Sequence, residues 1–425
     1  MNTTDLRRRA TAATVLGVAA AMLAGCSSSS GSSASSSSAS AASSAGVAAA
    51  TSAAAVSSAG SATPAATATG ASGSGSSGTV ATSLDLTEAQ EIAALGRTTN
   101  TAFCGTKPIT LGIQDGYGVN AWSQASLAAV RSEAAKCPNV KTVVQIGEGD
   151  LQKSISQLNS MVAQGAKAVV VIPDFGKAEL PAIKAATTAG VSVVPWGADP
   201  GGTAGSDYVS YVDWSSPSAG TLWAQWMVKT LGGKGNIVFI GGPAGNPVTS
   251  GQLQSVVKVV AANPGIKLLT GTSNWPVTNW DPATAQKIMA SLLAKYPTIN
   301  GVISDYGTDA LAATRALQAA NRPLVPIATL DANGLACLYK KQSGASDAGF
   351  QLATISSRNW LGRIAARKAI AAAEGVKDTE PSTFTLPIIE DSTGTDKPVC
   401  LSGQSDDFYT SNQITPADLA KYGKP

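Results

Sequence analysis

The run Ala168-Val169-Val170-Val171-Ile172 decides the fold class of this chain. Five consecutive apolar residues, four of them β-branched, predict a strand that is buried on both faces. On either side of it, residues 151–164 and 179–189 carry apolar side chains at three- and four-residue spacing, which predicts helices. A buried strand between two helices is the repeating unit of a parallel sheet that helices cover on both faces.

The alternation of strands and helices continues in both directions from this run. In the first half of the chain, further strands are expected at residues 109–113, 140–146, 191–194 and 208–212, and a further helix at 121–135. In the second half, strands are expected at residues 237–241, 266–271, 302–305, 327–330 and 352–356, and helices at 217–230, 249–262, 282–296, 309–320 and 335–342. This repetition predicts an α/β fold with two doubly wound parallel-sheet lobes rather than one large sheet.

The first quarter of the chain differs in composition from this folded region. Three arginines at residues 7–9 precede an apolar run at residues 10–24, and Leu23-Ala24-Gly25-Cys26 ends the run. A basic patch, a short apolar stretch and small residues before a cleavage point are typical of a secretory signal peptide, here residues 1–25. An ordinary signal peptide that happens to contain a cysteine is one interpretation. The four residues 23–26 also resemble the bacterial lipobox, which predicts lipidation of Cys26.

Residues 26–98 are interpreted as the lipidated cysteine and a disordered linker. From residue 27 to about residue 83 the sequence is almost entirely Ser, Ala, Gly and Thr, which offers no large side chain to bury. A lipid anchor followed by a flexible linker would hold the exported folded region at the outer face of a cell membrane.

Composition and charge argue against several classes of function. The chain has 30 basic and 27 acidic residues, a net charge of +3 with the two signs interspersed, so no nucleic-acid partner is expected. It has no histidine, the side chain used most often as a general base and as a metal ligand. No metal, no cofactor and no enzymatic activity are expected. Paired acids such as Asp305 and Asp309 could act in catalysis, but a role as hydrogen-bond acceptors explains them more simply.

Four cysteines remain after Cys26, namely Cys104, Cys137, Cys337 and Cys400. An even number in an exported chain favours two disulfides, and buried free thiols are the alternative. Four cysteines allow three pairings.

Most of the tryptophans fall in loops that follow predicted strands, together with Asp and Asn side chains. The six tryptophans in such loops are Trp122, Trp196, Trp214, Trp275, Trp280 and Trp360. A single tryptophan at such a place more often packs against the core than binds a ligand. Ligands of open parallel sheets bind outside the carboxyl ends of the strands, where these loops gather. Six tryptophans there predict a pocket with flat apolar walls and hydrogen-bonding edges, which suits a sugar ring.

Several segments, in their order along the chain, resemble the ribose-binding and related periplasmic sugar-binding proteins, the type I solute-binding family that serves ABC importers. The resemblance runs from about residue 109 to residue 389 and rests on residues 109–113 followed by Asn120-Ala121-Trp122, residues 157–173, residues 241–251 and residues 310–317. It implies the type I periplasmic binding protein fold, in which a three-segment hinge joins the two lobes.

The resemblance also implies positions for the ligand contacts. Asn120 and Trp122 match the residues that clamp the sugar after the first strand, and Trp280-Asp281 matches an aromatic-acid pair. Asp305 or Tyr306 matches a residue that accepts hydrogen bonds from the sugar, and Asp331 matches another such residue. With residues of other strand-end loops, the full set of ligand-binding candidates is Asn120, Trp122, Trp196, Asp213, Gln252, Trp280, Asp305, Tyr306, Asp331, Ser357 and Arg358.

The sequence departs from the family pattern at three places. Trp196-Gly197-Ala198-Asp199 stands where an Asp-Arg pair often grips sugar hydroxyls, Gln252 stands for an expected arginine, and Ser357 beside Arg358 stands for a glutamine. Without the family's Asp, Arg and Gln side chains, the site loses bidentate hydrogen bonds that would fix the orientation of the ligand. The ligand is therefore expected to differ from ribose, being larger or less polar.

The resemblance implies crossovers between the lobes near residues 211–213, 356–358 and 384–387. The expected organisation is an N-terminal lobe of residues 99–211 plus 357–385, a C-terminal lobe of residues 212–356 plus 386–410, and a tail of residues 411–425. On this organisation Cys104 shares a lobe with Cys137, and Cys337 shares one with Cys400. These pairings are favoured because bridges within a lobe leave a hinge free to move.

The expected function is capture of a small polar ligand, a sugar or polyol, by a monomer that delivers it to the permease and ATPase subunits of an ABC importer. The chain carries no Walker-type phosphate loop, so those subunits would be other chains. The glycine-rich stretch at residues 241–245 is interpreted as a turn. The alternative function is a ligand-sensing receptor domain that signals to a membrane partner.

Overall fold

The computed structural model describes residues 101–118, 120–343, 350–412 and 414–425. The predicted signal peptide, the lipidation candidate Cys26 and the predicted linker to residue 98 lie outside the described residues. Within the described ranges, no helix is both long enough and apolar enough to cross a membrane.

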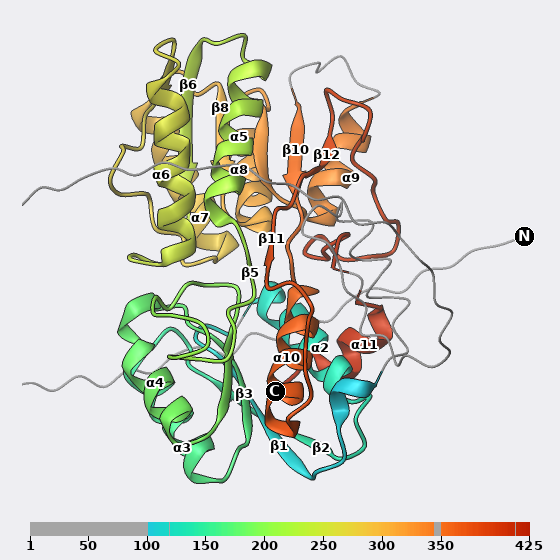
Figure 1. Ribbon diagram of the computed structural model, residues 1–425. Coiled ribbons are helices and arrows are strands. Elements are labelled where there is room, and N and C mark those ends of the chain that lie inside the picture. The colour runs from blue at the N-terminus through green and yellow to red at the C-terminus, as the bar shows by residue number, and fades with distance from the viewer. Residues whose placement is uncertain (1–100, 119, 344–349, 413) are drawn as a thin grey trace, which may run out of the picture. The chain divides into compact units, whose positions relative to one another are not determined.

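The first lobe is built on a parallel four-stranded sheet in the order β2-β1-β3-β4 (Figure 1). Its strands are β1 (Ile109–Asp115), β2 (Val140–Ile146), β3 (Ala168–Ile172) and β4 (Ser192–Pro195). Its helices are α2 (Ala121–Ala134), α3 (Leu151–Ala163), α4 (Leu180–Thr188) and, from far along the chain, α10 (Leu361–Glu374), with the 3-10 turns η1 (Ala102–Cys104) and η2 (Gly176–Ala178).

Strand β3 shows why the apolar run has no polar position. Val170 belongs to a core cluster that includes side chains of α2 and α10, whereas Val169 and Val171 belong to the cluster that includes α3 and α4. Successive side chains of a strand point to opposite faces, so a sheet covered on both sides needs apolar residues at every position. All five residues of β3 are buried.

The second lobe is built on a six-stranded sheet in the order β12-β10-β9-β8-β6-β7, in which β12 alone is antiparallel to its neighbour. Its strands are β6 (Gly235–Ile240), β7 (Ile266–Leu268), β8 (Gly301–Ser304), β9 (Ile327–Leu330), β10 (Leu352–Ile355) and β12 (Ile388–Asp391). Its helices are α5 (Ser216–Thr230), α6 (Pro247–Ala261), α7 (Pro282–Lys295), α8 (Gly307–Ala319) and α9 (Asn333–Gln342). Alternate residues of β6 face α5 with α6 on one side and α7 with α8 on the other.

Three segments of chain run between the two sheets (Figure 1). Two of them pair as short parallel strands, β5 (Asp213–Trp214) and β11 (Thr383–Phe384). The third follows β10 and includes Ser357 and Arg358 before α10 begins. The fold is the type I periplasmic binding protein fold expected from the sequence.

The predicted strand at residues 208–212 is wrong. This segment runs beside β4 only through isolated bridges and single hydrogen bonds, such as Val212 N to Pro195 O at 3.0 Å, and the true strand begins at Asp213. Pro195 has no N–H to donate, so a continuous ladder cannot form at this edge.

Two disulfides stabilise the lobes separately. Cys104 pairs with Cys137 and Cys337 pairs with Cys400, over sequence separations of 33 and 63 residues. The first joins η1 to the connection between α2 and β2, and the second joins α9 to the segment after β12. These are the favoured pairings.

The segment after Cys400 contacts both lobes. From the sequence, its last part, residues 411–425, was predicted to be a tail. These residues contain the helix α11 (Pro416–Tyr422), which packs against α2 of the first lobe.

Candidate ligand-binding site

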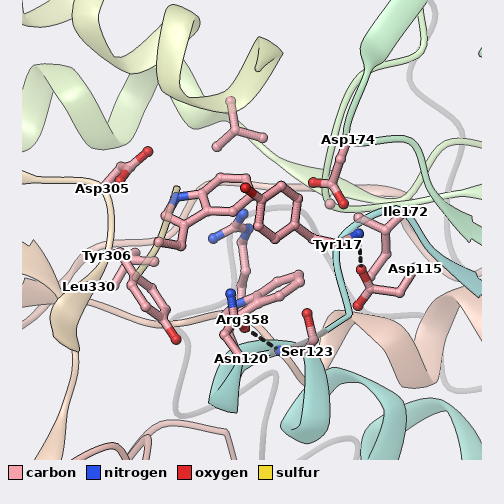
Figure 2. A pocket seen from close by; sticks show the side chains of 14 residues that line it. Asp115, Tyr117, Asn120, Ser123, Ile172, Asp174, Asp305, Tyr306, Leu330 and Arg358 are labelled. Carbon is pink, nitrogen blue, oxygen red and sulfur yellow. Dashed lines mark hydrogen bonds between the residues drawn. The ribbon is translucent and has the colours of Figure 1, made fainter. Parts of the chain in front are cut away.

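A pocket lies where the carboxyl ends of the strands of both sheets meet, as expected for open parallel sheets. It contains about 480 Å³ of space not filled by atoms, including space open to solvent. The first lobe contributes residues that follow β1, β3 and β4, and the second lobe contributes residues at the ends of β8 and β9 and before α7 (Figure 2). The lining residues are Asp115, Tyr117, Asn120, Trp122, Ser123, Ile172, Asp174, Gly197, Val248, Trp280, Asp305, Tyr306, Leu330 and Arg358.

Aromatic side chains from both lobes form the apolar walls. The rings of Tyr117 and Trp280 meet edge to face across the two lobes, with centroids 5.3 Å apart. Trp122 is half-buried and stacks on the buried Trp196 behind it at 5.7 Å. The Trp122 Nε1 donates to the Ser357 carbonyl oxygen at 2.7 Å, which fixes the indole against the hinge.

Trp280 depends on an unusual local backbone. Asn279 and Trp280 both have positive φ angles, 56° and 52°, in a region that costs free energy for residues with a side chain. The indole lies against Gly242, where an added Cβ would come within 2.2 Å of Trp280 ring atoms. Only glycine at residue 242 lets the ring occupy this place.

Asp305 offers a free acceptor on the second-lobe side of the pocket. Its Oδ2 accepts hydrogen bonds from Gly242 N at 3.0 Å and from the Thr249 hydroxyl, whereas its Oδ1 is buried and has no hydrogen-bond partner. Burial raises the pKa of Asp305 above its ordinary value, although Thr249, Gly242 and Trp280 favour the charged form. A buried oxygen without a partner costs free energy, which a ligand hydroxyl could recover by donating to it.

Two carboxylates face Asp305 from the first lobe (Figure 2). Asp115 accepts from Tyr117 N at 2.8 Å, and burial raises its pKa. Burial and then the negative charges of Asp115 and Glu179 raise the pKa of Asp174 well above its ordinary value, against the opposing effect of Arg358. Polar donors on a ligand would relieve this concentration of acceptors.

Arg358 is the cationic group of the pocket. Its guanidinium carbon lies 4.5 Å from the Trp214 ring centroid and 5.1 Å from that of Trp122, and its Nε has no hydrogen-bond partner. Burial lowers the pKa of Arg358, while Asp213 raises it. The residue has a positive φ of 59° in the hinge segment, so backbone strain accompanies its placement. Arg358 can donate to a ligand from the hinge side.

The structure thus places six of the eleven sequence candidates around one pocket and five outside its lining. The lining includes Asn120, Trp122, Trp280, Asp305, Tyr306 and Arg358. Trp196 supports Trp122 from behind. Ser357 offers its carbonyl oxygen to Trp122 and its N–H to Asp331. Gln252 is fully buried on α6 with neither side-chain polar atom hydrogen-bonded, and α5 packs closely there through Gly220.

Asp213 and Asp331 lie next to the hinge, outside the pocket lining. Asp213 accepts from the Tyr211 hydroxyl at 2.5 Å, and burial raises its pKa to about 7. Asp331 is fully buried, and its two oxygens accept four hydrogen bonds from Ser357, Thr410 and Ser411. Its acceptors are therefore already used by the protein itself.

The list of candidates missed several residues of the first lobe, above all Asp115, Tyr117 and Asp174. Their signal was present, because Asp115 and Asp174 follow predicted strands, as ligand-contacting residues of this fold class do. Asn246 was missed as well: its Nδ2 donates to the Asp174 carbonyl oxygen at 3.1 Å, so it joins the two lobes beside the pocket.

Comparison with known proteins agrees with this architecture. The family model described as "Periplasmic binding protein domain" matches residues 116–377, and the chain belongs to this family. The chain is 28% identical over 219 residues to the xylitol-binding protein of Mycolicibacterium smegmatis, covering 50% of this chain and 61% of that protein. It is 27% identical over 199 residues to the D-apiose import binding protein of Paraburkholderia graminis, covering 46% and 61%. The chain spans about three fifths of the length of these relatives.

Solved structures support the fold. A galactofuranose binding protein superposes with a TM-score of 0.57 at 21% identity, covering 66% of this chain and 93% of that chain. The periplasmic binding protein component of the arabinose ABC transporter from Shewanella sp. ANA-3 gives 0.57 at 20% identity, covering 65% and 89%.

Proposed function

We propose that this protein is an exported solute-binding lipoprotein that captures a sugar or polyol and delivers it to an ABC importer. The observation that carries the proposal is the pocket between the lobes, which combines aromatic walls with acceptors and donors that the protein leaves unpaired. Two relatives are named a xylitol-binding protein and a D-apiose import binding protein, and these names support the same ligand class.

The lining suits a small molecule rich in hydroxyl groups. The C–H faces of such a molecule would lie against Trp122 and Trp280, because flat aromatic rings bury apolar area without consuming hydrogen bonds. Its hydroxyl groups would donate to Asp305 Oδ1 and Asp174 and accept from Arg358. Asp305 Oδ1 and Arg358 Nε are buried and would otherwise remain without a partner, which penalises a ligand that lacks hydroxyls.

Capture would work through closure of the two lobes. The lining comes from both lobes and from the hinge, so a ligand makes its full set of contacts only when the lobes are together. A ligand shifts such an equilibrium by the difference between its affinities for the closed and open states. The closed form would then dock on a permease that works with an ATPase, and this chain would perform no chemistry itself.

The proposal extends to the location of the protein. Lipidation of Cys26 after removal of residues 1–25 would anchor the chain at the outer face of the membrane as a monomer, and residues 27–98 would serve as a flexible linker. The lobe boundaries proposed from the sequence complete this picture, with the segment after residue 410 added as a structured element rather than a tail.

A thermal-shift screen of the full chain tests the proposal. The panel contains xylitol, myo-inositol, pentoses, hexoses, nucleosides and amino acids, because a bound ligand raises the unfolding temperature with the logarithm of its concentration over Kd. A shift confined to sugars or polyols, with a change in tryptophan fluorescence, supports the proposal. A shift confined to nucleosides or amino acids overturns the ligand class. A sugar-binding chain that fails to stimulate uptake by its neighbouring permease would point to sensing instead.

A further inference from the structure

The segment from Cys400 to the C-terminus, named here the C-terminal strap, lies outside the matched family domain, which ends at residue 377. It begins at the disulfide partner of Cys337 in the second lobe and ends in α11, on α2 of the first lobe. Three segments already cross between the lobes, so the strap is a fourth connection.

The strap is firmly attached to the second lobe. The Asn333 side chain donates to the carbonyl oxygens of Leu401, Gln404 and Ser405 at 3.2 to 3.3 Å and accepts from Leu401 N at 2.8 Å. Asp331 adds three hydrogen bonds from Thr410 and Ser411. Because one oxygen of Asp331 also accepts from Ser357 N in the hinge at 2.6 Å, this carboxylate ties strap, hinge and β9 together.

The strap is attached to the first lobe as well. Ile414 packs with Ala128 and Ala129 of α2, and Leu419 and Tyr422 join the same cluster. The Arg131 guanidinium of α2 donates to the carbonyl oxygen of Tyr422 at 3.1 Å. Separating the lobes must therefore break one of these two attachments or stretch the chain between them.

Between its two attachments the strap touches the wall of the ligand pocket. Tyr409 is 1% exposed, and its hydroxyl donates to the hydroxyl of Tyr306, a lining residue, at 3.0 Å. The two rings cluster with Ala125 of α2, and Trp122 and Trp280 pack against the same group. Tyr409 thus holds Tyr306 from behind at the point where the two lobes meet.

We infer that the C-terminal strap is a working part of the ligand site, in which Tyr409 positions Tyr306 and the attachment to α2 favours the closed arrangement of the lobes. This inference rests on the proposed function for its effect on affinity. Its effect on lobe opening does not depend on any ligand.

The first test measures affinity in Tyr409→Phe, which removes one hydroxyl and keeps the ring. Tyr296→Phe is the matched control, because the Tyr296 hydroxyl donates to the Leu269 carbonyl oxygen at 2.8 Å and neither residue lines the pocket. With xylitol as the probe, or the member of the screen that shifts the unfolding temperature most, calorimetry should show Kd raised about threefold to tenfold in Tyr409→Phe. The control should keep the wild-type Kd, and equal affinities in all three proteins would overturn the positioning role.

The second test needs no ligand. A chain that stops after Asn412 lacks α11 but keeps every strap contact with Asp331 and Asn333. Hydrogen exchange is followed at Val248 and Thr249, beside the lobe contact between Asn246 and Asp174, which the strap does not touch. Exchange there should be at least threefold faster in the shortened chain, because the lobes open more often.

Unchanged exchange at Val248 and Thr249 would overturn the bracing role even if ligand affinity fell. If no member of the screen binds the wild-type chain, the proposed function fails, and the exchange measurement still decides whether the strap restrains the lobes.

Discussion

At the scale of single residues, Asp305 is the side chain whose bonding most directly indicates a ligand. One oxygen is fully engaged by Gly242 and Thr249, and the other has no partner. Asp305→Asn can keep the engaged oxygen in place but turns an NH₂ group toward the ligand, which removes the acceptor. We expect ligand binding to weaken by about 1 to 3 kcal/mol, measured by calorimetry.

Asp309→Asn provides the matched control for this prediction. Asp309 is also buried, accepts from Thr278 at 2.5 Å and has one oxygen without a partner, but it does not line the pocket. Its substitution should leave affinity unchanged. If both variants bound equally well, Asp305 would be a structural acid and not a ligand contact.

Buried carboxyl groups also make stability depend on pH. Burial raises the pKa values of Glu179, Asp213 and Glu390 to about 7, far above those of the unfolded chain. The folded protein therefore binds more protons than the unfolded chain near neutrality, and its stability should fall as pH rises. Between pH 6 and pH 8 each group should account for about 1 kcal/mol of lost unfolding free energy.

Glu390→Gln isolates one of these contributions. Glu390 accepts from the Thr354 hydroxyl at 2.7 Å and from Val399 N at 3.2 Å, contacts that do not involve the pocket lining. Urea unfolding at pH 6, 7 and 8 should show a shallower loss of stability for this variant than for the wild type. A Glu390→Gln slope equal to the wild-type slope would contradict the assignment.

At the scale of elements, each disulfide should act within its own lobe. The bridges close loops over sequence separations of 33 and 63 residues. Each bridge is expected to stabilise its lobe by about 4 kcal/mol, because it lowers the chain entropy of the unfolded state. The double variants Cys104→Ser with Cys137→Ser, and Cys337→Ser with Cys400→Ser, should each unfold at lower urea concentration. Their effects should add, because the bridges share no partner.

The second bridge also fixes the start of the strap. Cys337→Ser with Cys400→Ser should therefore weaken ligand binding in addition to lowering stability, whereas the first double variant should affect stability alone. Equal affinities in the two double variants would indicate that Asn333 and Asp331 hold the strap without the bridge.

The elements that the sequence could predict are those whose pattern is local. Strand β3 is buried on both faces, so its five apolar residues indicate it without reference to the rest of the chain. The segment at residues 208–212 contains two valines and two tyrosines, which also favour a strand, but whether it pairs depends on Pro195 in a neighbouring strand. Pairing is a tertiary property and leaves no signal within the segment itself.

The candidate site was predictable to a similar extent. Trp280 and Asp305 were identified because they follow strands, and the fold brings such positions together. The position of Asp331 follows the same rule, yet its oxygens are taken by Ser411 and Thr410, some eighty residues away. No local pattern could reveal that a later segment of chain would occupy an acceptor that otherwise suits a ligand.

At the scale of the whole molecule, the expected anchor gives a separate prediction. Cys26→Ser should leave ligand affinity unchanged and move the protein from the membrane fraction to the medium, because the lipid chains would have no attachment point. Fractionation followed by immunoblotting measures this. Retention of Cys26→Ser at the membrane would show that another part of the chain, or a partner, holds the protein there.

The contact between Gly242 and Trp280 has a consequence for how a receptor of this kind could lose its ligand without losing its fold. A single methyl group at residue 242 needs the space that the indole of Trp280 occupies, and this indole lines the pocket. Gly242→Ala would therefore push the protein's own tryptophan into the place of the solute. Such a chain would keep its fold, but its own tryptophan side chain would exclude the proposed ligand from the pocket.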